Sequence, residues 1–347
     1  MTRYKMADRD QLNLAVVGLG YWGPNYVRVL SEIERVTLKY CCDLDESKFD
    51  KLRRFLSNVK TTTDYKEILE DEEVDAVVIT TPPNTHYRII KDCLKHQKHV
   101  LVEKPMTDNL ENAKEVVNLA NKVGKVLMVG HIYLYNPGIL KLKNMLETGE
   151  MGRVFYGIAL RLGLGPIRKF ASALWDLAIH DIYISMYLFK SKPISVLCVG
   201  ESYLQDDIED YVNLTLKYPN KINFSIYASW FCPEKARKIT LVGSEKMVTF
   251  DDTNKTEMIK IFEKSLNLAL LNSTPKYVDH QMIVRQGDTK IPYIEQSEPL
   301  RNQIEHFIEC IKTGKTPRSC REQGLTVIEV LEAAEKSLKS GEGIVCQ

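Results

Sequence analysis

The feature that most constrains the fold of this chain is a glycine-rich turn that joins an apolar segment to an amphipathic one. The turn has the spacing Gly18-x-Gly20-x-x-Gly23, with Tyr21 and Trp22 before its last glycine. Such glycines let a strand turn sharply into a helix, whose first N–H groups then point at a closely approaching pyrophosphate. The turn therefore predicts a dinucleotide site, and a tight connection without a ligand is the alternative.

An aspartate, Asp43, follows the turn at the distance typical of dinucleotide sites. Asp43 lies 20 residues beyond Gly23, at the end of the apolar segment Val36 to Cys42. There it can accept hydrogen bonds from the adenosine ribose. Its charge would repel the 2′-phosphate of NADP, and the next residue, Leu44, supplies no compensating cation. We therefore expect NAD as the cofactor.

The hydrophobic pattern changes near residue 130. Before it, short apolar runs alternate with amphipathic stretches, as in β-α units around a parallel sheet. After Pro137, apolar and polar residues alternate, which is typical of strands covered on one face. The sequence predicts an α/β Rossmann domain over 1–130 and an α+β domain with an open, mainly antiparallel sheet over 131–347. The C-terminal helices, 300–340, can pack back towards the first domain.

Individual elements follow from the same patterns. In the first domain we expect strands at 13–18, 36–42, 75–80, 99–102 and 126–130, with helices that begin near Gly23, Glu46, Asp64, Thr85 and Asp108. Thr107 and Asp108 are residue types that can cap a helix. In the second domain we expect strands at 154–162, 194–199, 212–216, 222–226, 239–243, 247–250 and 258–262, and helices at 300–312 and 324–340. The segment 265–296 is irregular and resembles an insertion.

Composition narrows the class of protein. The 347 residues suffice for two domains, and 47 Lys plus Arg against 46 Asp plus Glu give no charge that would attract nucleic acid or an anionic membrane. The first nine residues lack the apolar stretch of a signal peptide, and no run approaches the ~20 apolar residues of a membrane span. We expect a cytoplasmic protein whose eight cysteines, which form no CxxC pair, stay reduced.

A lysine ends the fourth expected strand. Val100 to Val102 runs into Glu103-Lys104-Pro105, at the edge of a parallel sheet where ligands collect. When an alcohol is oxidised, a hydride leaves carbon and a proton leaves oxygen, so a nearby group must accept or share the proton. Lys104 can do so if its pKa falls, which burial and a nicotinamide cation favour and Glu103 opposes. A surface ion pair is the alternative.

With these residues the chain resembles the glucose-fructose oxidoreductase and inositol dehydrogenase family (Gfo/Idh/MocA). The resemblance rests on the glycine turn, on Glu103-Lys104-Pro105 and on the segment after the third strand, and it extends over nearly the whole chain. It implies an NAD-dependent sugar dehydrogenase or reductase acting on CH–OH, with Lys104 in catalysis or substrate orientation. Expected cofactor contacts beyond the turn and Asp43 are Thr80, Thr81, Pro82, Asn84, His86, Glu103, Lys104 and His131.

Asp176 and His180 are four residues apart in a helical pattern, so their side chains share one face. A histidine beside a carboxylate titrates near neutrality and suits general-base removal of a hydroxyl proton. A metal would need a third ligand, which no His or Cys cluster supplies, so we expect none; a structural surface pair is the other alternative. The family resemblance implies that His180 is the base, that Lys104 assists, and that Asp176 lines the substrate site.

Other polar residues point to the substrate. His131, Tyr133 and Tyr135 follow the fifth strand and can touch nicotinamide or substrate. Arginine suits a diphosphate, and we expect substrate contacts from Tyr133, Arg161, Arg168 and Arg237. The segments around Arg168, Trp175 to Asp181, Arg237 and Glu298 to Leu300 resemble the branch of the family that acts on nucleotide sugars at C3, such as the dehydrogenases of UDP-N-acetylglucosamine and its uronic acid.

Two other functions remain open from the sequence. One is a free polyol or aldose dehydrogenase of inositol or glucose type, and the other is a non-catalytic, NAD-dependent binding or regulatory protein. An open sheet with one uncovered face usually packs against another protein surface. We therefore expect a homodimer or homotetramer that takes a small sugar or nucleotide sugar and no nucleic acid or membrane partner.

Overall fold

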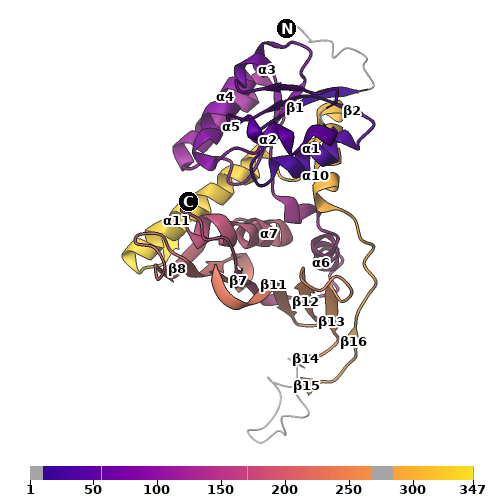
Figure 1. Ribbon diagram of the computed structural model, residues 1–347. Helices are drawn as coiled ribbons and strands as arrows, with labels where there is room; N and C mark the ends of the chain where they lie inside the picture. Colours follow the sequence, from indigo (N-terminus) through magenta and orange to yellow (C-terminus); the bar gives the residue numbers. More distant parts are fainter. Residues whose placement is uncertain (1–10, 56, 170, 267–283, 347) are drawn as a thin grey trace, which may run out of the picture. The chain divides into compact units, whose positions relative to one another are not determined.

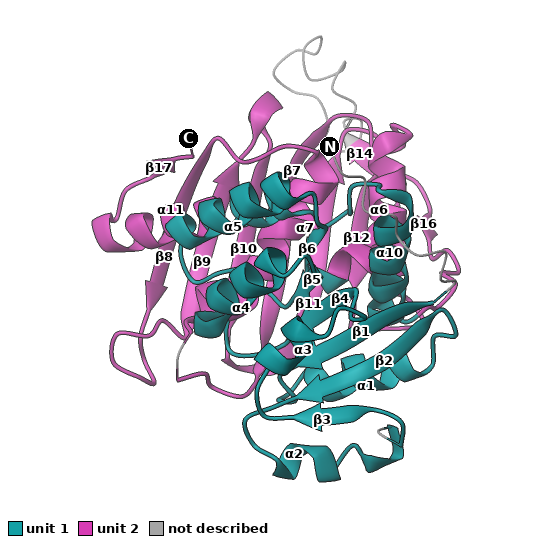
Figure 2. Cartoon of the chain, turned by 90° about the horizontal axis from the view of Figure 1, so that it is seen from above, with its two compact units in different colours: residues 1–132, 298–328 teal, residues 133–297, 329–347 magenta. Residues whose placement is uncertain are grey.

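The chain forms two compact units. The computed structural model describes residues 11–55, 57–169, 171–266 and 284–346 (Figure 1). Unit 1 consists of the chain up to Ile132 together with Glu298–Ile328, and unit 2 consists of Tyr133–Ser297 together with Glu329–Gln347 (Figure 2).

Unit 1 is built on a six-stranded parallel sheet with the order β3-β2-β1-β4-β5-β6. Successive strands extend outwards from β1 in one direction and then, from β4, in the other. In such sheets ligands bind at the carboxyl ends of the strands where the order reverses, which here are the ends of β1 and β4. The strands are β1 (Leu12–Val17), β2 (Val36–Cys42), β3 (Lys60–Thr62), β4 (Ala76–Ile79), β5 (His99–Val102) and β6 (Leu127–Val129).

Local sequence explains where the helices of unit 1 begin and end. Asn109 caps α5, because its side chain accepts a hydrogen bond from the Asn112 N–H, and Gly124 ends the helix in the left-handed conformation. Thr107 and Asp108 therefore do not cap this helix as expected; the Thr107 hydroxyl donates to the Asn109 carbonyl instead. The helices are α1 (Gly23–Ser31), α2 (Ser47–Asp50), α3 (Lys66–Glu70), α4 (Pro83–Lys95), α5 (Leu110–Val123) and the 3-10 turn η1 (Arg53–Phe55), and a second 3-10 turn, η2 (Ile132–Tyr135), begins at the last residue of the first segment of unit 1 and continues into unit 2.

A C-terminal segment completes unit 1. Helix α10 (Pro299–Thr313) buries one face that includes Gln303, Ile304 and Phe307. After it, the chain reaches the edge of the parallel sheet, where the Val129 N–H donates to the Ser319 carbonyl and Met128 forms a bridge with Cys320. Helix α11 (Arg321–Ser340) follows.

Unit 2 contains a nine-stranded sheet with the order β16-β13-β12-β11-β7-β10-β9-β8-β17. Its pairs are antiparallel except for β7 and β10. The strands are β7 (Val154–Leu164), β8 (Ser195–Glu201), β9 (Tyr211–Lys217), β10 (Asn223–Ser229), β11 (Phe231–Gly243), β12 (Met247–Asp251), β13 (Ile259–Phe262), β16 (Thr289–Lys290) and β17 (Ile344–Val345), and a separate pair joins β14 (Ser265–Leu266) to β15 (Val284–Arg285).

One face of the unit 2 sheet is buried and the other is open. On β9, Val212, Leu214 and Leu216 are buried, while their neighbours are half-exposed. The helical elements of this unit are α6 (Pro137–Glu147), the 3-10 turn η4 (Pro219–Lys221), a π-helical turn η3 (Leu174–Ala178) and α7 (Ile179–Phe189). Asn136 caps α6 by accepting a hydrogen bond from the Gly138 N–H.

The structure confirms the predicted fold class and most of its elements, and the differences have simple causes. Strand β3 was not expected, since its three residues, Lys-Thr-Thr, carry no apolar alternation. The expected continuous helix around His180 is instead a π-helical turn followed by α7. The expected irregular segment 265–296 holds three short strands, and its residues 267–283 lie outside the described chain. Among the described residues, none of the helices combines the length and apolar character of a membrane span.

Candidate active site

The glycine turn follows β1, and its three glycines meet different structural requirements. Gly18 has φ +96°, and a Cβ on it would lie 2.7 Å from the Thr81 amide nitrogen. A Cβ on Gly23 would lie 2.2 Å from the Gly18 carbonyl oxygen. At Gly20 a Cβ would meet nothing within 4 Å. The fold itself requires Gly18 and Gly23, whereas Gly20 leaves an open surface to which the pyrophosphate of a dinucleotide fits.

Asp43, at the end of β2, contacts this turn directly. Its Oδ2 accepts the Leu19 N–H at 2.6 Å and its Oδ1 accepts the Asp45 N–H at 3.0 Å. A carboxylate oxygen has two lone pairs, so each can accept a further hydrogen bond from a ribose hydroxyl. Leu44 is fully exposed beside it and brings no positive charge. Asp43 thus both supports the turn and presents its carboxylate where the sequence predicted it.

The segment after β4 lies against the same turn. The Thr80 hydroxyl donates to the Gly18 carbonyl at 2.5 Å, and the Thr81 hydroxyl accepts from Thr85. Pro82 and Asn84, at the start of α4, are exposed. On the turn itself Tyr21 is exposed and Trp22 packs against it edge to face, with 6.0 Å between ring centroids. These side chains are accessible for a cofactor.

Two histidines that we expected at the cofactor are buried. His86 is 0% exposed, and its ring nitrogens each lie 2.8 Å from a carbonyl oxygen, of Thr81 and of Pro105. His131 is 1% exposed with Nδ1 at 3.4 Å from Gln323 Oε1, and burial lowers its pKa to about 3. Both rings are inaccessible in this structure, and their contacts with a cofactor stay a prediction. His86 ties the end of β4 to the segment after β5.

Glu103 also faces the protein interior. Its Oε1 accepts the Tyr26 hydroxyl at 2.8 Å, and that hydroxyl also accepts from the Gln303 amide of α10 at 3.1 Å. Its Oε2 accepts the backbone N–H of Lys104 at 3.1 Å. Burial raises the pKa of Glu103, and the hydrogen bond from Tyr26 and the charge of Lys104 oppose that rise. Glu103 thus fixes the backbone of Lys104, which follows β5 at the carboxyl edge of the sheet.

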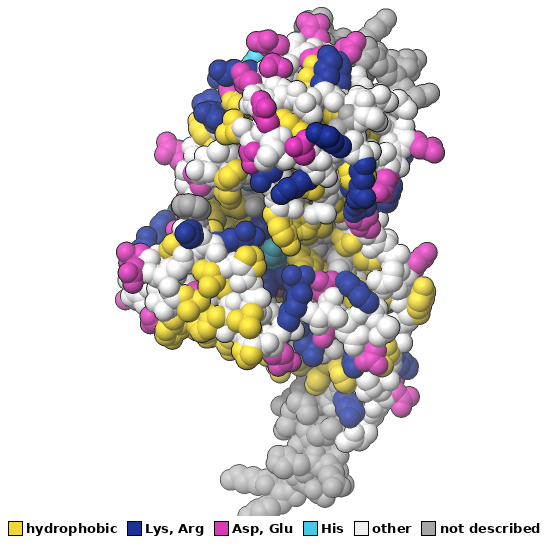
Figure 3. Space-filling view, viewed as in Figure 1, with side chains coloured by type: hydrophobic (Ala, Val, Ile, Leu, Met, Phe, Trp, Pro, Cys, Tyr) yellow, Lys and Arg dark blue, Asp and Glu magenta, His cyan; other side chains and the backbone are white. Residues whose placement is uncertain are grey.

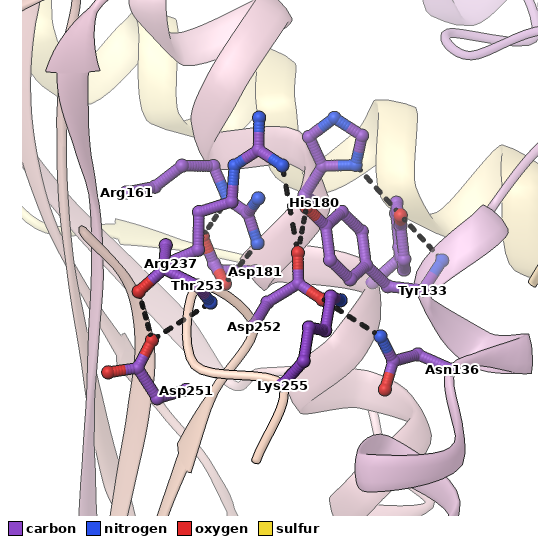
Figure 4. Close-up of polar contacts among 11 residues, drawn as sticks. Tyr133, Asn136, Arg161, His180, Asp181, Arg237, Asp251, Asp252, Thr253 and Lys255 are labelled. Atoms are coloured by element: carbon purple, nitrogen blue, oxygen red, sulfur yellow. Dashed lines mark hydrogen bonds and ion pairs between the residues drawn. The ribbon is translucent and has the colours of Figure 1, made fainter. Parts of the chain in front are cut away.

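In unit 2, His180 lies on α7, and its ring packs against two tyrosine rings, of which Figure 4 labels that of Tyr133. Its ring is 5.2 Å from that of Tyr133 and 5.5 Å from that of Tyr183, edge to face in both pairs. Its Nδ1 is 2.8 Å from the Tyr183 hydroxyl. The imidazole is half-buried. Packing and one hydrogen bond therefore hold the predicted base in a defined orientation.

A buried ion pair between Arg161 and Asp181 lies next to the Tyr133 ring. Arg161 of β7 donates from Nε and Nη2 to the two carboxylate oxygens of Asp181, at 2.6 and 2.9 Å. Its guanidinium also lies over the Tyr133 ring, 4.6 Å from the centroid, and the residue is only 6% exposed. Arg161 therefore directs Nε and Nη2 to Asp181 inside the unit, and its contact with substrate stays a prediction.

The other predicted substrate residues are accessible. Asp176 accepts from the Trp230 indole at 3.3 Å and pairs with Arg168 at 3.6 Å. Arg237 of β11 lies 3.6 Å from Asp252. Arg168 and Arg237 are both 44% exposed at their side chains. Asp176 therefore has Trp230 and Arg168 as neighbours in addition to its place one turn before His180.

The sequence did not predict several residues of this region. Asp252 follows β12 and accepts from the Asn136 amide at 3.0 Å and from Lys255 at 3.0 Å, and the Tyr133 hydroxyl lies 3.5 Å away (Figure 4). No local pattern connects positions 136 and 252. Tyr183 could have been found, since it stands three residues after His180 on one helix face. Within the described ranges no group of three His, Cys, Asp or Glu could hold a metal ion.

The fold and these residues define a dinucleotide-binding oxidoreductase. Residues 12–131 match the oxidoreductase family with an NAD-binding Rossmann fold, and residues 139–249 match the GFO/IDH/MocA C-terminal domain. The chain therefore belongs to the Gfo/Idh/MocA family of oxidoreductases. The match confirms the predicted NAD-binding domain.

Individual relatives span nearly the whole chain. The scyllo-inositol 2-dehydrogenase (NAD(+)) of Bacillus subtilis (strain 168) is 26% identical over 339 residues, which cover 95% of each protein. Among solved structures, GenD2 from gentamicin A biosynthesis in complex with NAD has a TM-score of 0.81 at 24% identity and 97% coverage of both chains. UDP-N-acetylglucosamine 3-dehydrogenase GnnA from Acidithiobacillus ferrooxidans has a TM-score of 0.80 at 22% identity, with 95% and 98% coverage. The two structural likenesses establish a shared fold.

Proposed function

We propose that this chain is an NAD-dependent dehydrogenase or reductase that transfers a hydride between the nicotinamide and a ring carbon of a sugar or polyol. The observation that carries the proposal is the setting of His180, a half-buried imidazole held between Tyr133 and Tyr183. The scyllo-inositol dehydrogenase named above supports a substrate with ring hydroxyls. Bound NAD would supply the hydride acceptor at the edge of the parallel sheet.

In the oxidation, the substrate hydroxyl loses its proton to His180 as the carbon gives up its hydride, and the C–O single bond becomes a carbonyl. Lys104 shares the proton or stabilises the charge that develops on the oxygen. In the reverse direction His180 returns the proton. Asp176 lines the substrate site next to Arg168. The cofactor contacts are those of the turn, Asp43 and the exposed residues after β4.

For the substrate itself we propose C3 of a nucleotide sugar, such as UDP-N-acetylglucosamine or its uronic acid. Arg168 and Arg237 support this choice, because both are half-exposed on unit 2 and suited to a diphosphate. Each has a carboxylate at 3.6 Å, a loose contact that a diphosphate could replace. The GnnA structure shares the fold.

The second candidate is oxidation of an unphosphorylated polyol. The inositol dehydrogenase relative supports it, as does the compensation of Arg168 and Arg237 by Asp176 and Asp252. A site whose cations are already paired has less need of an anionic substrate. A preference for myo- or scyllo-inositol over every nucleotide sugar would favour this candidate.

The test is turnover on a panel of UDP-sugars, inositols and aldoses, followed by the absorbance of reduced cofactor. On the best substrate, Lys104→Met and His180→Asn should each lower kcat by roughly 10²- to 10⁴-fold. The matched controls Lys122→Met and His96→Asn change exposed residues of unit 1 and should retain full activity. Full turnover in both site variants would refute the assignment. NAD binding without turnover on the whole panel would favour a regulatory protein.

We also propose that a second copy of the chain covers the open face of the unit 2 sheet. Tyr156 and Ile158 of β7 and Leu197 and Val199 of β8 are exposed there, and apolar side chains gather over these strands in Figure 3. Apolar patches of this kind mark protein interfaces. Light scattering should give a dimer or tetramer, and Val199→Lys should shift it towards monomer. A monomeric wild-type protein would reject this.

A further inference from the structure

The hydroxyl of Tyr183 forms a hydrogen bond with the proposed base. It lies 2.8 Å from His180 Nδ1, three residues along the same helix. The Tyr183 side chain is 0% exposed, so no substrate can reach it. It is fixed at its other side by the Tyr133 backbone N–H, which donates to the same oxygen at 3.4 Å.

We propose that Tyr183 is the positioning residue of His180: its oxygen accepts the Nδ1–H and thereby leaves Nε2 as the nitrogen that exchanges the substrate proton. This inference rests on the proposed function of His180 as base. In a neutral imidazole only one nitrogen carries a proton, so a base at Nε2 requires the proton at Nδ1.

The geometry around the hydroxyl agrees with this assignment. A phenolic oxygen has two lone pairs, so the Tyr183 oxygen, which accepts the Tyr133 N–H, has a second lone pair that can accept the Nδ1–H of His180. Because the imidazolium also carries its proton at Nδ1, the same hydrogen bond persists when Nε2 takes up the substrate proton. The partner therefore does not have to rearrange during the reaction.

The surroundings keep Tyr183 in its neutral form. Burial raises the pKa of Tyr183 well above its usual value, and the nearby charge of Arg161 opposes that rise. Arg161 is itself neutralised by the bidentate contact with Asp181, and Tyr133 lies between its guanidinium and His180. A neutral phenol orients the imidazole without adding the negative charge that a carboxylate partner would bring.

The test is a nitrogen-15 NMR spectrum of the full-length enzyme labelled at histidine, with the His180 signals assigned by their loss in His180→Asn. Above the pKa of His180, the wild type should show a protonated Nδ1 and an unprotonated Nε2. Tyr183→Phe should shift this pattern towards a protonated Nε2. Tyr218→Phe is the control, because it removes a buried hydroxyl that contacts Ser185 of the same helix, and it should leave the His180 pattern unchanged.

Kinetics supply the second measurement. On the substrate found above, Tyr183→Phe should lower kcat by roughly 10- to 100-fold with KM nearly unchanged, and Tyr218→Phe should not. A wild-type His180 protonated at Nε2, or a pattern that Tyr183→Phe does not alter, would overturn this inference and leave the dehydrogenase proposal standing. If Tyr183→Phe does not fold, the protonated nitrogen of His180 in the wild-type spectrum alone tests the inference. If Nδ1 of His180 is protonated but the enzyme turns over no sugar or polyol, the role of Tyr183 in setting the tautomer is supported and the proposed function is refuted.

Discussion

The two units hold their candidate residues in different ways. In unit 1 the candidate cofactor residues follow directly on β1, β2 and β4, and backbone geometry positions them: a glycine with φ +96°, and a carboxylate that accepts the Leu19 N–H. In unit 2 the residues around His180 come from η2, β7, α7, the cap of α6 and the residue after β12, and side chains hold them, above all the Arg161–Asp181 pair. The geometry of the candidate site in unit 1 therefore depends on the backbone of the glycine turn. The geometry of the candidate site in unit 2 depends on buried polar pairs of side chains.

The largest expected effect comes from breaking the pair in unit 2. Arg161→Met leaves Asp181 buried without its partner and should lower the free energy of unfolding by about 3–5 kcal/mol. Urea unfolding, followed by the fluorescence of Trp175 and Trp230, measures it. Arg161→Met combined with Asp181→Leu should recover most of the loss. NAD should stabilise the single variant as it does the wild type, and a loss of NAD binding would contradict the assignment of the cofactor to unit 1.

The glycine turn offers the matching test in unit 1. Gly18→Ala places a Cβ at positive φ and 2.7 Å from the Thr81 nitrogen, and should cost about 2 kcal/mol of stability without ligand. Gly20→Ala meets nothing and should leave that stability unchanged. It should still reduce the rise in melting temperature on adding NAD, because its methyl group occupies the surface that the pyrophosphate approaches. Thermal unfolding with and without NAD distinguishes the two variants.

Asp43 should have a smaller and more selective effect. Asp43→Asn removes the negative charge and one acceptor, so NAD should bind about tenfold more weakly, or about 1.4 kcal/mol, while NADP should bind no worse. Calorimetric titration of both cofactors measures the difference. Equal losses for NAD and NADP would mean that Asp43 acts only through the Leu19 N–H, as a support for the turn.

Buried histidines give unit 1 a predicted pH dependence. The pKa of His131 is lowered by burial from 6.5 to about 3, so between these values the unfolded chain binds a proton that the folded chain does not. The stability of unit 1 should therefore fall as pH falls, by about 1 kcal/mol between pH 6 and pH 5. His131→Gln should reduce this slope. An unchanged slope would assign the effect to the other buried histidines, His86 and His99.

Much of unit 1 could be predicted, because its information is local. The alternation of apolar strands and amphipathic helices, the glycine spacing and Asp43 are all visible along the chain. The sequence did not predict the burial of two side chains in this unit: His86 and His131 follow the expected strands, but their ring nitrogens have polar partners inside the fold.

In unit 2 the sequence predicted the sheet and singled out His180, but it did not predict which side chains surround that histidine. Arg161 was expected at the substrate and is neutralised by Asp181, twenty positions away. Asp252 and Asn136 were not expected at all. A carboxylate or an arginine has the same residue type whether it faces a ligand or a buried partner, so its role depends on what packs against it.

The sequence by itself therefore determined the fold class, the dinucleotide turn, the NAD preference and the residue types available for proton transfer, because these depend on neighbours within about twenty residues. Only the tertiary structure decided which polar groups stay accessible and which pair inside. Those choices follow from contacts between strands and helices far apart in the chain, where burial makes an unpaired charge too costly to leave without a partner.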